Sequence, residues 1–253
     1  MPRSNTTPRS RKIFRQPGFF ALLALSLAMP ALADETRHYP RGGERSSDDA
    51  YQLRLRLGVF ELDGRSAFWD DSFGIFTGSR ASFDDVEWGV DFNARLSYWW
   101  DLQVSGTSYE SATGRSYRDY TDGFGDEVVH EAGLSLSSLT VAAVLYPLGR
   151  GRTFTPYVGI GGGFYSWDYY EIGDFIDFDV DPAEVISAGF EARGVTMGRY
   201  LMAGLDIPIS ADWKIFVEGR WTRVDDQLAD DFDGFGTIDL SGRTVSVGFS
   251  YSF

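Results

Sequence analysis

The chain has 253 residues, of which 23 are basic and 37 acidic, so its formal net charge is −14. This acidic balance argues against a nucleic acid as partner, because the phosphate backbone would be repelled. With no cysteine in the sequence, disulfide bonds are excluded.

Residues 1–33 have the three parts of a secretory signal peptide. Five basic residues and no acid come first, followed by the apolar run GFFALLALSLAM and a small-x-small cleavage site at Ala31–Ala33. The run is shorter than the ~20 residues of a membrane-spanning helix. We therefore expect an exported protein with a signal peptide over 1–33, a polar leader over 34–50 and one β domain over 51–253.

Eight segments of the β domain are predicted strands. Four of them alternate strictly between apolar and polar residues, which is the period of a β-strand: 51–61, 86–98, 213–222 and 244–253. Four weaker ones lie near 102–109, 134–146, 156–167 and 195–208. The third of these is rich in glycine, which weakens a strand or marks tight curvature.

The connections between these strands alternate in length. Long segments are expected at 62–85, 110–133, 168–194 and 225–236, and short turns at 99–101, 147–154 and 208–212. Outer-membrane barrels have this alternation of long outer loops and short periplasmic turns. We therefore predict an all-β fold, an eight-stranded antiparallel transmembrane β-barrel in the bacterial outer membrane.

The polar faces of the strong strands carry charges of both signs, whereas their apolar faces end in Trp and Tyr. A soluble sandwich or lipocalin would bury the apolar face, but lipid-facing barrels combine aromatic girdles with a polar interior. We predict a network of charges across the lumen, formed by Arg54, Arg56, Glu87, Asp91, Arg95, Glu218 and Arg220.

Two stretches resemble small eight-stranded outer-membrane proteins of the OmpA/OmpW/OmpX type. The final VSVGFSYSF is similar to the C-terminal signal for barrel insertion in that group, and TPYVGIGGGFYSW is similar to its PYVGAG strand. The resemblance implies that Tyr251 and Phe253 belong to an insertion signal read by the barrel-insertion machinery. It also implies that passage of small apolar molecules, as in OmpW-like proteins, is one variant of the function.

The expected long loops hold most of the acidic excess. Their carboxylates are ligands that calcium and magnesium prefer, and no other cofactor is expected. The stretch from Asp177 opens like an EF-hand loop, but Pro182 and Ala188 stand where that motif needs glycine and glutamate. A looser cation site and a plain solvated surface both remain open, and the candidate ligands are Asp174, Asp177, Asp179, Asp181, Asp230, Asp231 and Asp233.

The same loops are rich in aromatic residues, which we expect to pack together into a structured cap. An apolar vestibule or a partner surface are the alternatives.

One alternative function is a lipid A-modifying enzyme that uses His130. Glu127, Glu131 and Ser135 lie near it in the sequence, and a His-acid-Ser set could generate a nucleophile. The His-x-Ser pair of the deacylases is missing, because Ala132 takes the serine position. We therefore expect a non-enzymatic, monomeric barrel that is structural or binds ligands at its loops, surrounded by outer-membrane lipid and lipopolysaccharide.

Overall fold

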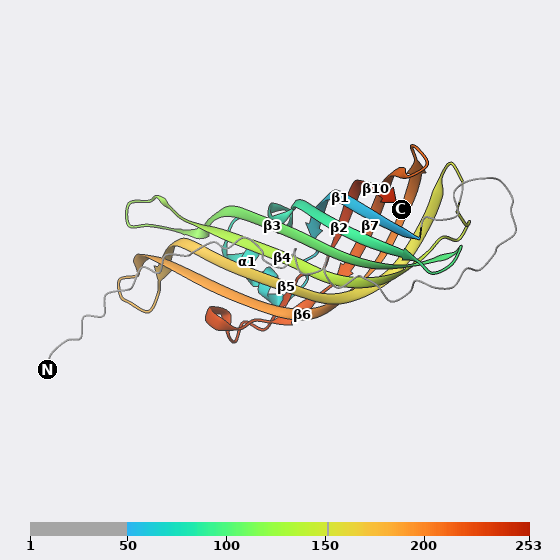
Figure 1. Cartoon of the computed structure of the whole chain (residues 1–253). Coiled ribbons are helices and arrows are strands. Elements are labelled where there is room, and N and C mark those ends of the chain that lie inside the picture. The colour runs from blue at the N-terminus through green and yellow to red at the C-terminus, as the bar shows by residue number, and fades with distance from the viewer. Residues whose placement is uncertain (1–49, 151) are drawn as a thin grey trace, which may run out of the picture.

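The computed structural model describes residues 50–150 and 152–253. Eight strands of this part of the chain close into an antiparallel barrel in the order β1-β10-β7-β6-β5-β4-β3-β2 (Figure 1). The predicted eight-stranded antiparallel barrel is therefore confirmed. The expected signal peptide and all of the leader except Ala50 lie outside the described residues.

The barrel strands are β1 (Tyr51–Leu62), β2 (Asp85–Arg95), β3 (Trp100–Thr121), β4 (Glu127–Leu145), β5 (Thr155–Asp177), β6 (Glu184–Pro208), β7 (Trp213–Arg223) and β10 (Gly242–Ser252). The other elements are α1 (Ala67–Ile75), η2 (Arg80–Phe83), β8 (Asp225–Gln227), η3 (Asp230–Phe232) and β9 (Thr237–Asp239). No helix among the described residues has the length and apolar character needed to cross a membrane.

The barrel wall is much taller on one side than on the other. Strands β3, β4, β5 and β6 have 22, 19, 23 and 25 residues, whereas β1, β2, β7 and β10 have 11 or 12. Figure 1 shows the four long strands running side by side past the ends of the others. The expectation of long loops at 110–133 and 168–194 is therefore wrong, because strand pairing continues through most of both segments.

The face that carries apolar side chains changes along the long strands. On β5, Val158, Ile160 and Phe164 are exposed on the outside of the barrel, whereas Tyr165 and Trp167, further along, are buried on the inside. Lipid covers the outer face in the first half, and water covers it in the second, so the apolar side chains turn inward there. Each long strand thus consists of a membrane-spanning half and an extracellular half.

Glycines at inward positions of β5 make room for large neighbours. A Cβ atom at Gly161 would lie 2.7 Å from the ring of Tyr200, and one at Gly159 would lie 2.5 Å from the Met202 side chain. The glycine-rich stretch that the sequence shows is therefore where side chains of β6 pack flat against the barrel wall.

The extracellular halves enclose a hydrophobic core. It is filled by α1 and the β8–β9 hairpin, which bring Phe68, Trp69, Leu228 and Ile238 against Tyr169 of β5. We call this part of the molecule the cap: residues 62–85 and 225–241 with the extracellular halves of β3 to β6. The expected packing of loop aromatics is present for these rings, whereas the side chains at three tips are exposed: Phe124, Phe178 and Phe235.

The last strand closes the barrel against the first. Strand β10 pairs with β1 from Gly242 to Ser252, and the backbones of Tyr51 and Phe253 exchange two hydrogen bonds of 3.1 and 3.0 Å. The Phe253 ring lies 6.1 Å from the ring of Tyr51 and stacks on Tyr251 at 6.0 Å. Both candidate insertion residues thus lie in the aromatic rim at the periplasmic end of this seam.

Deleting Phe253 is expected to leave the protein in the periplasm or degraded, because the deletion removes the last pairing and ring contacts of the closing strand. Cell fractionation and a heat-modifiable gel band measure the folded, inserted fraction. Phe253→Tyr, which keeps an aromatic ring at that position, serves as the control and should insert normally. Normal outer-membrane levels of the truncated protein would contradict the assignment of Phe253 to an insertion signal.

Candidate functional site

Six of the seven charged residues predicted for the lumen lie buried inside the membrane-spanning half of the barrel. Arg54, Arg56, Glu87, Asp91, Glu218 and Arg220 are each at most 7% exposed. Arg95 lies on the same face of β2 but is exposed, since it is the last residue of that strand at the periplasmic mouth. The structure therefore brings six of the seven together and leaves one at the rim.

Glu218 is the centre of the buried network. Arg220 Nη2 lies 2.9 Å from Glu218 Oε1, and Arg54 Nη2 lies 3.7 Å from Glu218 Oε2. The Tyr157 hydroxyl donates to Glu218 Oε2 at 2.9 Å and accepts a hydrogen bond from Arg54 at 2.6 Å. Pairing and hydrogen bonding together are what makes buried charge tolerable in a protein interior.

A second branch of the network joins β1 to β2. Arg56 Nη1 lies 2.7 Å from Glu87 Oε1, and Arg56 Nε lies 3.6 Å from Asp91 Oδ1. Arg220 lies 3.9 Å from the same Asp91 oxygen, which links the two branches across the lumen. Since the charged groups of opposite strands meet in the middle, the network fills the lumen.

Sequence reasoning missed two members of this network. Asp206 lies 3.6 Å from Arg54 Nη2, and Tyr157 places its ring 4.8 Å from the Arg54 guanidinium. Asp206 alternates with outward Leu205 and Ile207, so the period of two could have assigned it to the lumen. Tyr157 was hidden within the glycine-rich stretch, where the alternation of polar and apolar residues is weak.

Arg115 is a buried charged residue of the cap, and no pattern in the sequence singled it out. Its guanidinium donates to the Ser72 hydroxyl at 2.7 Å, to the Ser72 carbonyl at 3.0 Å and to the Thr77 carbonyl at 3.0 Å. It also lies 3.8 Å from Glu171 of β5. Arg115 thus attaches the C-terminal end of α1 and the residues after it to the inner face of the long wall.

His130 lies in the extracellular half of β4, inside the cap and outside the membrane-spanning half. Its ring is packed against Phe76 at 4.4 Å and Phe175 at 4.8 Å, and both buried ring nitrogens have no hydrogen-bond partner among the residues that the structure describes. Burial, followed by repulsion from Arg115, lowers the pKa of His130 to about 4. The imidazole is therefore neutral near pH 7.

The suggested partners of His130 do not converge on it. His130 has an even number and points into the cap, whereas Glu127, Glu131 and Ser135 have odd numbers and lie on the outer face of the same strand. Glu131 accepts a hydrogen bond from the Tyr170 hydroxyl at 2.9 Å on that outer face. The strand period of two therefore separates the histidine from the candidate acids and nucleophile.

The seven candidate cation ligands lie on the surface of the cap. The Asp177 carboxylate accepts from the Asp179 backbone at 2.9 Å in the β5–β6 turn, and Asp174 accepts from the Ser187 hydroxyl at 2.6 Å. Asp231 accepts from the Glu191 backbone at 3.0 Å and so ties η3 to β6. Among the described residues, no three His, Asp or Glu side chains are grouped so that they could hold a metal ion. A calcium or magnesium site stays a prediction.

Comparisons with known proteins agree with this architecture. The model of the family described as outer membrane protein beta-barrel domain matches residues 19–253. The outer membrane protein OprG from Pseudomonas aeruginosa is 14% identical, with a TM-score of 0.52 over 80% of this chain and 95% of that one. Neisserial surface protein A is 10% identical, with a TM-score of 0.47 over 80% and 96%.

A search of curated protein sequences finds no significant match. The similarity to OprG, at this level of identity, concerns the fold. The family match covers nearly all of the chain, and the closed barrel has the exposed apolar band and polar interior of outer-membrane barrels. The chain therefore belongs to the outer membrane protein β-barrel domain family and resides in the bacterial outer membrane.

Proposed function

We propose that this protein is a non-enzymatic barrel that does not conduct ions and that displays a folded, acidic cap at the cell surface. The observation that carries the proposal is the filling of the interior in two layers. Paired charges occupy the lumen within the membrane, and the aromatic core around Trp69 and Tyr169 occupies the space above them. An eight-stranded barrel is just wide enough for its own side chains to fill it.

Electrical recording in planar lipid bilayers tests the closed interior. The purified, folded protein is expected to give no large, steady channel, because ions would have to displace both layers. A variant lacking residues 66–82, which removes α1 and most of η2 from the cap, should also stay closed, since the charge network remains. A large, steady conductance from the wild-type protein would overturn the proposal.

The filled interior also argues against the two alternative functions, passage of small apolar molecules and catalysis by His130. Passage of a small apolar molecule along the barrel axis would meet the ionised groups around Glu218, which such a molecule cannot solvate. Catalysis by His130 would require a ring nitrogen with access to a nucleophile, and both nitrogens are enclosed by aromatic rings. Lipid A from cells with and without the protein should therefore be identical by mass spectrometry.

The acidic surface of the cap supports a binding role for divalent cations, or for lipopolysaccharide phosphates bridged by them. Six of the seven candidate aspartates are exposed, and Asp177 is partly exposed. Like charges repel over the ~8 Å Debye length of physiological salt, and a divalent cation would relieve that repulsion. Millimolar calcium is therefore expected to slow proteolysis of the β5–β6 turn.

The matched control replaces all seven aspartates with asparagine, which keeps side-chain size and removes charge. Its cleavage should be the same with calcium and with chelator. Equal cleavage of the wild-type protein in both conditions would show that these carboxylates form a solvated surface and bind no calcium.

A further inference from the structure

Two arginines lie side by side on the outer face of the barrel. In the pairing of β6 with β7, Arg199 stands directly opposite Arg223, and both side chains are exposed. The Cβ atoms of directly opposite residues in an antiparallel sheet are about 4.5–5.5 Å apart, and like charges at such positions destabilise the pairing. The two strands thus hold two positive charges together at a cost in stability.

Arg199 has no acidic partner on either side. Among the described residues, its guanidinium takes part in no ion pair, hydrogen bond or ring contact. Toward β5 it stands opposite Gly162, which has no side chain. Arg223 is held by Asp63 at 2.9 Å, but Asp63 also lies 3.3 Å from Arg65. The charge of Arg199 is therefore not balanced by any contact in the described part of the chain.

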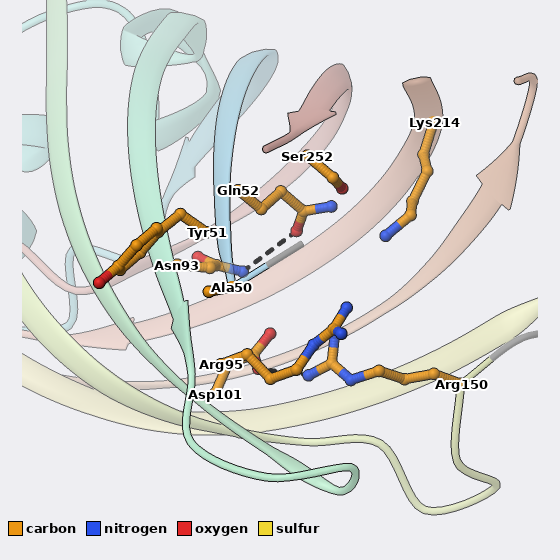
Figure 2. Close-up of a pocket in the computed structure, with 9 residues that line it drawn as sticks. All are labelled: Ala50, Tyr51, Gln52, Asn93, Arg95, Asp101, Arg150, Lys214 and Ser252. Carbon is orange, nitrogen blue, oxygen red and sulfur yellow. Dashed lines mark hydrogen bonds and ion pairs between the residues drawn. The ribbon is translucent and has the colours of Figure 1, made fainter. Parts of the chain in front are cut away.

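The nearest acid in the sequence does not supply the missing charge. Asp225, two residues after Arg223, is exposed and forms no ion pair with any described residue. At the periplasmic mouth, by contrast, the Arg150 guanidinium lies against the Asp101 carboxylate (Figure 2). The arginine pair at the opposite end of the wall thus lacks the kind of partner that the fold provides there.

The arginine pair lies at the outer edge of the apolar band. Leu201 and Trp221, the next outward-facing residues toward the periplasm, stand opposite each other and are exposed. Exposed tryptophan marks the membrane–water interface of outer-membrane barrels. Because the cap lies at this end of the barrel, the interface is that of the outer leaflet.

Apolar side chains surround Gly162 beside the arginine pair. Ile160 and Phe164 flank it along β5, and Met197 stands opposite Phe164 on β6; all three are exposed. The outer surface thus combines two guanidinium groups with an apolar wall next to them. This combination matches a lipid that has an anionic headgroup and acyl chains.

We propose that Arg199 and Arg223 bind a phosphate group of lipid A, the outer-leaflet glycolipid, whose acyl chains lie along the apolar wall around Gly162. A phosphate between the two guanidinium groups accepts hydrogen bonds from both, and the planar fork of arginine suits its oxygens. Its negative charge replaces the repulsion within the pair by attraction. This contact is direct and needs no divalent cation, unlike the bridged contact proposed above for the aspartates of the cap.

Native mass spectrometry of the folded, mature protein in maltoside micelles with chelator tests the site. Titration with lipid A and with its dephosphorylated form gives an affinity for each, and the wild-type protein is expected to prefer the phosphorylated lipid. Arg199→Gln should weaken binding of lipid A about tenfold, the effect of losing one charge-assisted hydrogen bond. Arg199→Lys, which keeps the charge, should weaken it less. Arg152→Gln is the matched control, because Arg152 is exposed in the periplasmic turn after β4 and its side chain has no contact among the described residues.

Thermal unfolding without lipid A separates a binding site from a structural role. Arg199→Gln should unfold at the same temperature as the wild type or at a higher one, because it removes one of two like charges. A lower unfolding temperature, equal affinity of the wild type for both lipids, or equal weakening by Arg152→Gln would overturn the proposal. Binding of lipid A that requires calcium would also overturn it and would support the cap aspartates instead.

Discussion

Replacing Glu218 with glutamine is expected to lower the free energy of unfolding by about 3–5 kcal/mol, the usual cost of removing one partner from a buried ion pair. Glutamine keeps the shape but leaves Arg54 and Arg220 without the carboxylate that both contact. Urea unfolding in lipid vesicles, followed by tryptophan fluorescence, measures the change.

An exposed ion pair provides the matched control. Glu61 pairs with Arg243 on the outside of the barrel, where the two side chains are 44% and 63% exposed. Exposed pairs contribute about 0–1 kcal/mol, so Glu61→Gln should change the unfolding free energy by no more than that. The double variant Glu218→Gln/Arg220→Gln should lose less unfolding free energy than the two single variants lose in total, since the two residues share one interaction. Equal effects of Glu218→Gln and Glu61→Gln would show that the lumen charges are not coupled.

Replacing Trp69 with alanine is expected to open the cap and leave the barrel closed. Trp69 is fully buried, its indole nitrogen donates to the Asp239 carbonyl at 2.8 Å, and Phe68, Phe83 and Tyr169 pack around it at 5.2 to 5.6 Å. Removing a buried aromatic ring costs about 3–5 kcal/mol. The loss falls on the cap, because Trp69 makes none of the pairings that close the barrel.

Trypsin digestion of the folded protein separates the two parts. Cleavage after Arg65 and Arg80, on either side of α1, should become faster in Trp69→Ala, while the heat-modifiable band of the barrel persists. Phe124→Ala is the control, since Phe124 is 94% exposed at the β3–β4 turn and surface substitutions usually change stability by less than about 0.5 kcal/mol. Loss of the folded band in Trp69→Ala would show that cap and barrel unfold as one unit.

The membrane-spanning half of the fold could be predicted from the sequence. Of the cap, the packing of loop aromatics could be predicted, but the continuation of the strands into it could not. In β10, valine and aromatic residues alternate with serine and glycine up to the last residues, so one pattern gives both the strand and its lipid-facing side. In the extracellular half of β5, the apolar residues move to the opposite face at Tyr165. Because the alternation of apolar and polar residues shifts by one position there, the sequence alone suggests that the strand ends.

The polar residues also differ between the two halves in how well the sequence predicts their positions. Arg54 and Arg56 stand at alternate positions within an unbroken pattern, so their place in the lumen followed from the period alone. Arg115 lies in a segment where serine, glycine, arginine and tyrosine mix on both faces, and its function depends on Ser72 and Thr77, about 40 residues away. Contacts between segments distant in the sequence leave no local pattern.

The unequal heights of the wall have a consequence for assembly. Strands β3 with β4, and β5 with β6, are joined by short turns at 122–126 and 178–183, so these two long hairpins close with little loss of chain entropy. The seam between β1 and β10 instead joins residues about 200 positions apart through only 11 residue pairs. We expect the tall wall to form first and the seam last. A barrel caught between these steps has two open strand edges, and such edges are what another open sheet can pair with during insertion.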